Sequence, residues 1–221
     1  MSFEFKINNS QLKIFKAAVF AACLIPLALL VYDGYTDGLG ANPIETITRS
    51  TGKWTLIFLL ITLGVTPLRR ITGWQAAIKF RRMLGLYAFF YVCLHFTTYI
   101  WLDQFFDLME IAKDIPKHPF ITVGFASFVL LIPLAVTSTS GMVRRLGKRW
   151  QQLHRLIYLI AIGGVVHYLW LVKADTRKPL IYGAILALLL GYRAFHAWGP
   201  RIARALQPKP RPVVSDGQPR N

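Results

Sequence analysis

Six long apolar stretches dominate this chain and leave little room for an ordinary soluble fold. Each approaches the roughly 20 residues that a helix needs to cross a bilayer, and only 16% of the 221 residues are charged. A soluble helical bundle would need charged outer faces, which these stretches lack. We therefore predict an all-α integral membrane protein with six transmembrane helices. The expected spans are 13–31, 54–68, 83–102, 120–137, 155–172 and 179–197.

The remaining segments read as tails and short connections. We divide the chain into a polar N-terminal tail (1–12), a six-helix transmembrane domain (13–198) and a basic, proline-rich tail predicted to be disordered (199–221). Asn42-Pro43 favours the start of a short interfacial helix before the second span. No internal repeat is visible.

The charge distribution predicts how the chain is oriented. The net charge of +16 would suggest a nucleic-acid partner in a soluble protein. Here, with the N-terminus inside, 19 of the 26 basic residues fall on the inner side, and eight of the ten acids fall outside. The positive-inside rule accounts for this split, so both termini are expected in the cytoplasm. The expected partner of the basic residues is the lipid bilayer, and no nucleic acid is expected.

Two histidines lie in the interior of apolar spans, where an unpaired polar side chain is costly. His95 and His167 each lie twelve residues into spans that run in the same direction, roughly 18 Å along the helix. Two neutral imidazoles at equal depth can clamp a metal, and haem iron takes axial histidines. Gly163-Gly164 would let a flat macrocycle approach the backbone. The alternative is a pair of packed, hydrogen-bonded histidines.

His154 has three interpretations from sequence. It precedes His167 by thirteen residues, roughly 20 Å on a helix. It could be a ligand of a second iron, a group at a flavin or quinone site, or an interfacial histidine. The matching depth on the third span holds Arg81 and Arg82, which are not neutral iron ligands. These arginines belong to a basic collar that serves topology and lipid contact, or binds a flavin phosphate or haem propionates. The collar comprises Arg81, Arg82, Arg144, Arg145, Lys148 and Arg149.

The connection between the third and fourth spans is acidic. It is expected to form an amphipathic helix at the membrane surface, and His118 is expected to be a solvated residue of the same loop. The acids give either a docking surface for a soluble partner or simply a soluble loop. They are Asp103, Asp107, Glu110 and Asp114.

Four segments resemble the MsrQ (YedZ) family, the haem-binding membrane subunits of bacterial MsrPQ methionine sulfoxide reductase systems, which have a ferric-reductase-like transmembrane domain. The segments are GLGANP (38–43), RRMLGLYAF (81–89), TSTSGMVRRLGKRWQQLHRLIYL (137–159) and HYLW (167–170). The resemblance implies one or two haem b groups and also FMN. Its important histidines fall on His95, His154 and His167.

The resemblance also implies a place in an electron-transfer chain. Electrons would come from the quinone pool or a cytoplasmic flavin reductase and pass to a periplasmic, MsrP-like molybdoenzyme that reduces oxidised methionines. The chain would be a multi-pass protein of the bacterial inner membrane, and an electron-transfer subunit rather than the site of substrate reduction. The competing interpretations are a proton-coupled transporter with a histidine relay and a non-redox membrane anchor.

Overall fold

The computed structural model describes residues 8–172 and 175–205, with side chains up to Trp198. This part of the chain is helical almost throughout and contains no β-strand. The elements are α1 (Asn9–Tyr35), α2 (Pro43–Thr72), the 3₁₀ helix η1 (Gln75–Phe80), α3 (Arg81–Thr98), the π-helical turn η2 (Tyr99–Asp103), α4 (Leu108–Lys117), α5 (Pro119–Val136), α6 (Ser140–Leu146), α7 (Lys148–Leu153), α8 (Leu156–Leu171) and α9 (Arg177–Ala205).

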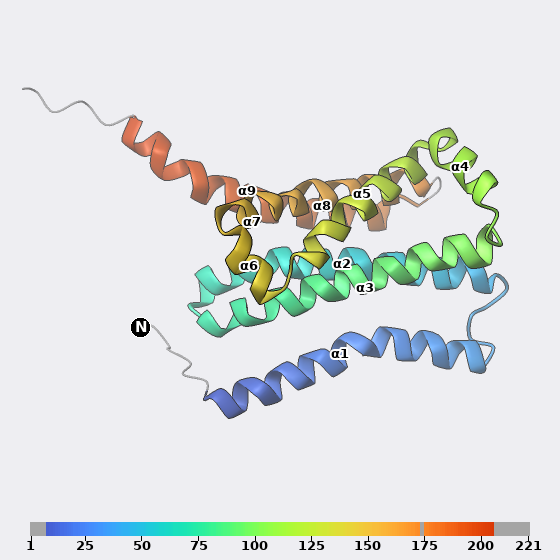
Figure 1. Ribbon diagram of the computed structural model, residues 1–221, viewed down its shortest axis with the longest axis horizontal. Coiled ribbons are helices and arrows are strands. Elements are labelled where there is room, and N and C mark those ends of the chain that lie inside the picture. Colours follow the sequence, from blue (N-terminus) through green and yellow to red (C-terminus); the bar gives the residue numbers. More distant parts are fainter. Residues whose placement is uncertain (1–7, 173–174, 206–221) are drawn as a thin grey trace, which may run out of the picture.

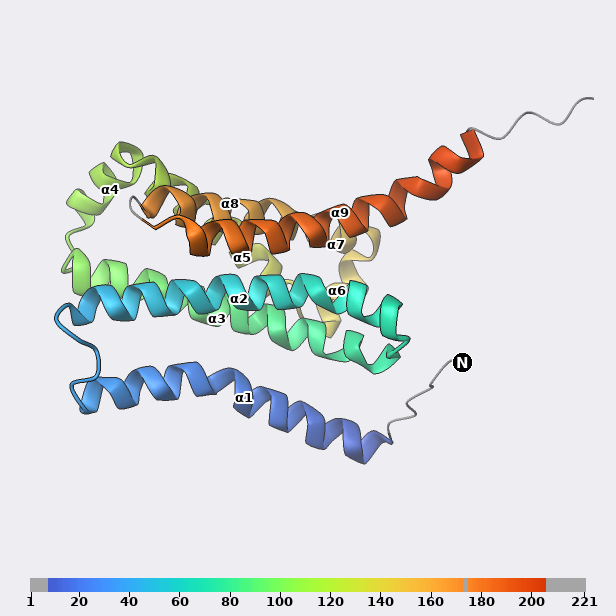
Figure 2. The same ribbon diagram turned by 180° about the vertical axis from the view of Figure 1, so that it is seen from behind.

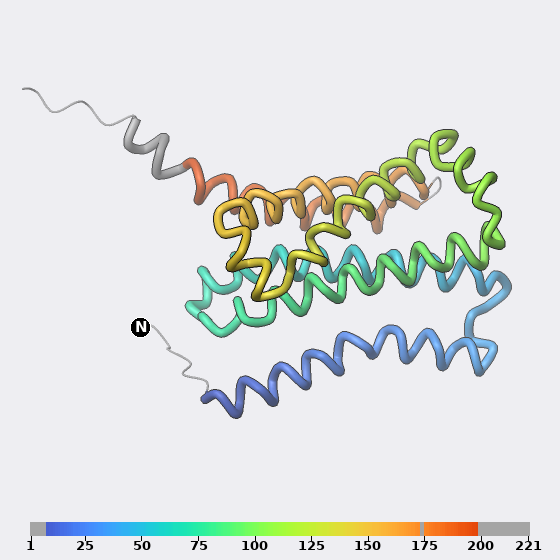
Figure 3. The backbone as a smooth tube through the Cα atoms, in the orientation of Figure 1, coloured from blue at the N-terminus to red at the C-terminus, as the bar shows by residue number. Residues whose placement is uncertain are grey.

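The predicted all-α fold with six spans is confirmed. Six helical stretches are long and apolar enough to cross a membrane: α1, α2, the continuous run η1–α3–η2, α5, α7–α8 and α9. Successive long helices run antiparallel, so α3 and α8 point the same way (Figure 3). The outermost parts of the two predicted tails, 1–7 and 206–221, lie outside the described residues. The helices α1 and α9 extend into the rest of both tails.

The second span differs from its prediction, because it absorbs the expected interfacial helix. α2 is a single helix of 30 residues. Asn42 caps its start, since its side chain accepts a hydrogen bond from the Glu45 amide at 3.2 Å. Gly73, with φ of 72°, ends it in the left-handed conformation that glycine tolerates. Pro67, near the C-terminal end, is the one proline inside this helix after Pro43 at its start.

The helices lie in three layers (Figures 1 and 2). α1 forms one outer layer, α2 and α3 form the middle, and α5, α8 and α9 form the other outer layer. α2 packs closely along α3, and α5 along α8, whereas the two pairs touch each other more sparsely. The structure is therefore built around two helix pairs, α2/α3 and α5/α8, with a cleft between them.

Tyr91 joins the first helix to this core. Pro26 lacks the N–H that an α-helix needs, which loosens the hydrogen-bond ladder of α1. The Tyr91 hydroxyl inserts there, donating to the Cys23 carbonyl at 2.9 Å and accepting from the Leu27 amide at 3.2 Å. The side chain is 1% exposed. One buried hydroxyl thus bridges a carbonyl and an amide of α1 on either side of Pro26.

Candidate functional site

His95 of α3 and His167 of α8 meet in the cleft between the two helix pairs. Their ring centroids are 6.1 Å apart, and the ring planes are inclined at 78°. Each histidine comes from a different pair, and each lies on an uninterrupted stretch of α-helix. Equal spacing along parallel helices therefore does bring the two imidazoles together.

Both imidazoles are held by the same kind of hydrogen bond. Nδ1 of His95 lies 2.9 Å from the Thr48 carbonyl of α2, and Nδ1 of His167 lies 2.7 Å from the Phe120 carbonyl of α5. A carbonyl oxygen only accepts, so each Nδ1 carries the proton and donates it. Each Nε2 is then left with a free lone pair, the state in which a histidine binds a metal.

Glycine makes both hydrogen bonds sterically feasible. A methyl group added at Gly52 would lie 3.0 Å from Cε1 of His95, and one added at Gly124 would lie 2.7 Å from Nδ1 of His167. Both separations are too short for an ordinary contact. Each ring thus lies flush against the backbone of the neighbouring helix in its own pair, in a space that a larger residue would fill.

The structure gives Gly163 and Gly164 different surroundings. A methyl group at Gly163 would collide with the Ser127 side chain of α5, and one at Gly164 would contact Leu56 of α2 at 3.6 Å. Gly163 therefore serves close packing of α8 against α5, whereas Gly164 lines a cavity that His95 and His167 also line.

The two helix pairs repeat the same local design, although no repeat is visible in the sequence. Each histidine follows its glycine by 43 residues and its carbonyl partner by 47. Most other positions at the same spacing hold different residues, so the likeness between the pairs is one of local geometry.

One cavity opens from the histidines between α3 and α5, and we call it the aromatic cavity. Its volume is about 490 Å³. Phe96 stacks against Phe128 with ring centroids 4.6 Å apart. The other lining residues are Thr48, Val92, His95, Tyr99, Asp103, Gln104, Asp114, Ile115, His118, Phe120, Ile121, Gly124, Phe125, His167 and Leu171.

His118 lies at the edge of this aromatic cavity, and its side chain remains 41% exposed, as expected of a loop residue. Its Nδ1 donates to Asp114 at 2.7 Å, and the Tyr99 hydroxyl donates to the other oxygen of the same carboxylate at 2.7 Å. The Asp114 side chain is only 16% exposed. The loop acid that sequence reasoning assigned to the surface therefore organises one wall of the cavity.

A second cavity opens from the same histidines between α2 and α8, and we call it the basic cavity. Its volume is about 440 Å³. It shares only Thr48, His95, His167 and Leu171 with the aromatic cavity. Its charged lining residues are Asp33, Arg49, Lys53 and Lys178. The histidine pair thus stands between two spaces of opposite electrostatic character.

His154 lies in a separate inner cavity of about 380 Å³, which Arg81 and Arg82 also line. Its ring stacks on Trp150 with centroids 3.9 Å apart. Nε2 lies 3.5 Å from the Ser138 hydroxyl, a long contact. His154 is the one histidine among the described residues that lines this cavity.

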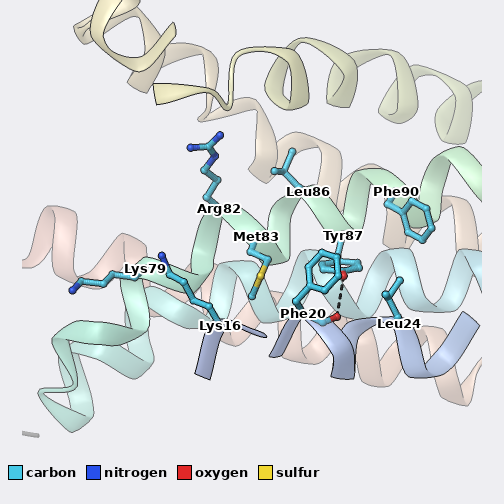
Figure 4. Close-up of a pocket in the computed structure, with 9 residues that line it drawn as sticks. All are labelled: Lys16, Phe20, Leu24, Lys79, Arg82, Met83, Leu86, Tyr87 and Phe90. Carbon is cyan, nitrogen blue, oxygen red and sulfur yellow. Dashed lines mark hydrogen bonds between the residues drawn. The ribbon is translucent and has the colours of Figure 1, made fainter. Parts of the chain in front are cut away.

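A fourth cavity, the α1–α3 groove of about 470 Å³, touches none of these histidines. Its walls are mainly apolar side chains, and Lys16 and Lys79 lie at one end of it (Figure 4). The Tyr87 hydroxyl crosses the groove and donates to the Phe20 carbonyl at 2.9 Å. It is a feature of the α1 interface and lies apart from the site.

The two histidine ligands suit a metal whose other ligands come from a cofactor rather than from the protein. Among the described residues no group of three or more His, Cys, Asp or Glu side chains could hold a bare ion, and zinc sites need at least three protein ligands. A haem supplies four nitrogens of its own and needs only two axial ligands. With metal–nitrogen bonds of about 2 Å, two imidazoles on one iron have centroids roughly 6 Å apart, which matches the observed 6.1 Å.

The comparisons with known proteins agree with this class of site. Residues 50–165 match the family model described as "Ferric reductase like transmembrane component". The protein-methionine-sulfoxide reductase heme-binding subunit MsrQ of Herminiimonas arsenicoxydans is 59% identical over 89% of this chain and 92% of its own length. The subunit of the same name from Azospira oryzae is 51% identical over 95% of this chain and 92% of its own length. No solved structure matches the chain.

The fold and the match to the family model define a ferric-reductase-like membrane protein. Within that class, the chain belongs to the MsrQ family of heme-binding subunits.

Proposed function

We propose that this chain is a membrane electron-transfer subunit that holds a haem b group between His95 and His167. The observation that carries the proposal is the matched pair of imidazoles, each oriented by a backbone carbonyl and each with a free Nε2. The names of its relatives, which include "heme-binding subunit", support the same cofactor. When bound, the haem would carry single electrons at its iron.

The protein's own groups have separate tasks in this proposal. His95 and His167 would hold the iron through Nε2, and the carbonyls of Thr48 and Phe120 fix the orientation and tautomer of the rings. Such outer hydrogen bonds typically change metal affinity by about 10–100-fold when removed. The apolar walls of the cleft keep water away from the site, which favours electron transfer over side reactions.

The direction of electron flow follows from orientation. With both termini in the cytoplasm, the histidine pair lies nearer the outer face of the bacterial inner membrane. We propose that electrons enter from the quinone pool or a cytoplasmic flavin reductase. They leave to a periplasmic molybdoenzyme that repairs oxidised methionines, a partnership that the relatives' name "protein-methionine-sulfoxide reductase" supports. Substrate reduction then takes place on the partner, not on this chain.

His154 belongs, in this proposal, to the electron-entry site. The inner cavity offers Arg81 and Arg82 opposite the imidazole, where a second pair of histidine ligands would need a histidine. Arginines suit an anionic or carbonyl-bearing group, which favours FMN or a quinone there over a second haem with two histidine ligands.

The test is to replace each histidine with alanine and record reduced-minus-oxidised absorption spectra of the purified protein. His95→Ala and His167→Ala should each lose the native haem spectrum. His196→Ala is the matched control, because His196 is exposed on α9 and packs against Tyr192, away from the cleft. Native spectra from both cleft variants would contradict the ligand assignment.

A further inference from the structure

We propose that the haem is bound in one orientation, with its two propionates in the basic cavity near Lys53 and Lys178 and its apolar edge in the aromatic cavity. This inference rests on the proposed function, because it takes His95 and His167 as the axial ligands. What it adds is the residues that recognise the carboxylates of the cofactor.

The position of the two cavities restricts where the edges of a macrocycle can go. One axial histidine comes from each helix pair, so a flat group between them must lie along the cleft that separates the pairs. The cleft opens on two sides: between α3 and α5 into the aromatic cavity, and between α2 and α8 into the basic cavity. Opposite edges of the macrocycle therefore enter different cavities.

Charge then selects which edge enters which cavity. The basic cavity is lined by three cations and one acid, Asp33. Among the residues that the structure describes, the aromatic cavity is lined by two acids, Asp103 and Asp114, and by no lysine or arginine. Propionates are carboxylates, so they would be repelled in the aromatic cavity and attracted in the basic one.

Two of the three cations are available for this role. Arg49 already forms an ion pair with Glu45 one turn earlier in α2. Lys53 and Lys178 have no carboxylate within 4.0 Å among the described residues. Lys53 follows Gly52, the residue against which His95 lies, so this lysine emerges at the level of the predicted iron ligand. One lysine comes from α2 and the other from α9, which would place a cation on two sides of the carboxylates.

The opposite edge of a haem carries methyl and vinyl groups, which need an apolar surface. Phe96, Phe125 and Phe128 provide it. The ring centroid of Phe96 lies 5.7 Å from that of Phe125 and 4.6 Å from that of Phe128. Burial of the apolar edge and neutralisation of the charged edge therefore favour the same orientation.

The experiment is a thermodynamic cycle in which binding affinity is measured with charges removed from the protein, from the cofactor or from both. The full-length chain, produced without haem, is titrated in detergent with haem b and with its dimethyl ester, which lacks the propionate charges. Lys53→Gln/Lys178→Gln should weaken native haem binding about tenfold, from two exposed charge pairs of up to about 1 kcal/mol each. The same variant should bind the ester about as well as the unaltered chain does. Lys16→Gln/Lys79→Gln removes equal charge in the α1–α3 groove and is the matched control. Any change in its affinity should be the same for native haem and for the ester.

A second measurement covers the case in which the chain without haem does not fold. The propionate bending modes in the resonance Raman spectrum of the haem-loaded protein should shift in the Lys53→Gln/Lys178→Gln variant and stay unchanged in the control. Equal loss of affinity for haem and ester, together with unshifted propionate modes, would overturn the inference.

The failure of this inference can be told from failure of the proposed function. If the two lysine substitutions have no propionate-dependent effect, while alanine at His95 or His167 still abolishes the native spectrum, only the orientation is wrong. If neutralising Asp103 and Asp114 strengthens native haem binding but not ester binding, the propionates lie in the aromatic cavity. If the histidine variants keep the native spectrum, the ligand assignment itself is wrong.

Discussion

Adding a single methyl group beside each histidine should weaken haem binding more where the space for the methyl group is smaller. An alanine Cβ at position 124 would lie 2.7 Å from Nδ1 of His167, which is 0.7 Å short of the 3.4 Å at which ordinary contact begins. The corresponding distance at position 52 is 3.0 Å, which is 0.4 Å short. The ring must move to relieve the overlap, and the short hydrogen bond to the Phe120 carbonyl is the first contact to be lost.

The magnitudes show which measurement will reveal the effect. Losing that hydrogen bond costs about 0.5–1.5 kcal/mol, but replacing a helical glycine by alanine returns up to about 1 kcal/mol. The melting temperature should therefore change little. Haem affinity has no such compensation, and outer-shell changes weaken it about 10–100-fold. We expect Gly124→Ala to lose the most haem and Gly52→Ala less.

The assay is haem bound per protein, together with affinity from competition with an apo-globin. Gly64→Ala is the matched control, because Gly64 is also in α2 and a methyl group there would have no neighbour within 4 Å. This control should keep full haem and be slightly more stable. If Gly124→Ala retains haem as well as Gly64→Ala does, the close approach of ring and backbone has no part in binding.

Three further predictions concern the rest of the molecule. A reporter that is active only after export, fused to the C-terminus, should be silent, since the basic residues favour a cytoplasmic C-terminus; high reporter activity would contradict the orientation. The Asp103→Asn/Glu110→Gln variant removes two exposed acids. It should slow haem reoxidation by the proposed soluble partner at low salt, with the difference vanishing at high salt. Equal rates of the variant and the unaltered chain at both salt concentrations would exclude this loop as the docking surface. Arg193→Gln should lower the melting temperature, because Arg193 donates to the Leu63 carbonyl at 2.6 Å and to the Tyr158 hydroxyl at 3.2 Å, and charge-assisted bonds contribute about 1.5–3 kcal/mol. Tyr158→Phe removes only the weaker bond and should lower the melting temperature less. An unchanged melting temperature in both variants would show that these bonds do not hold α9.

Hydropathy and helix geometry were enough to predict the six spans and the meeting of the two histidines. Both are properties of single helices: the length of an apolar run, and the depth reached after twelve residues. The same reasoning could not find the groups around the rings. Gly52 and Gly124 lie on other helices, and their role depends on how α2 packs on α3 and α5 on α8.

A signal for these glycines was nevertheless present in the sequence. The equal spacing of Gly52 from His95 and of Gly124 from His167 would have identified both, had spacings rather than residue identities been compared. Asp114, whose side chain is only 16% exposed, was misassigned for a different reason. Loop residues are usually solvated, and nothing in the sequence indicates that the chain folds back after η2 and sets Asp114 against Tyr99.

The division of the bundle into two pairs has a consequence for how the molecule matures. Each pair consists of long helices that follow one another among the transmembrane segments, so each can associate as soon as it leaves the insertion machinery. In the proposed function the cofactor would bridge both pairs, and it could enter only after the last ligand-bearing helix has been synthesised. Until then the pairs would be joined by sparse direct contacts and by α9, whose Arg193 contacts Leu63 of α2 and Tyr158 of α8. The chain without the cofactor would therefore be the less stable form. We therefore expect haem supply, rather than transcription alone, to govern how much of this subunit accumulates.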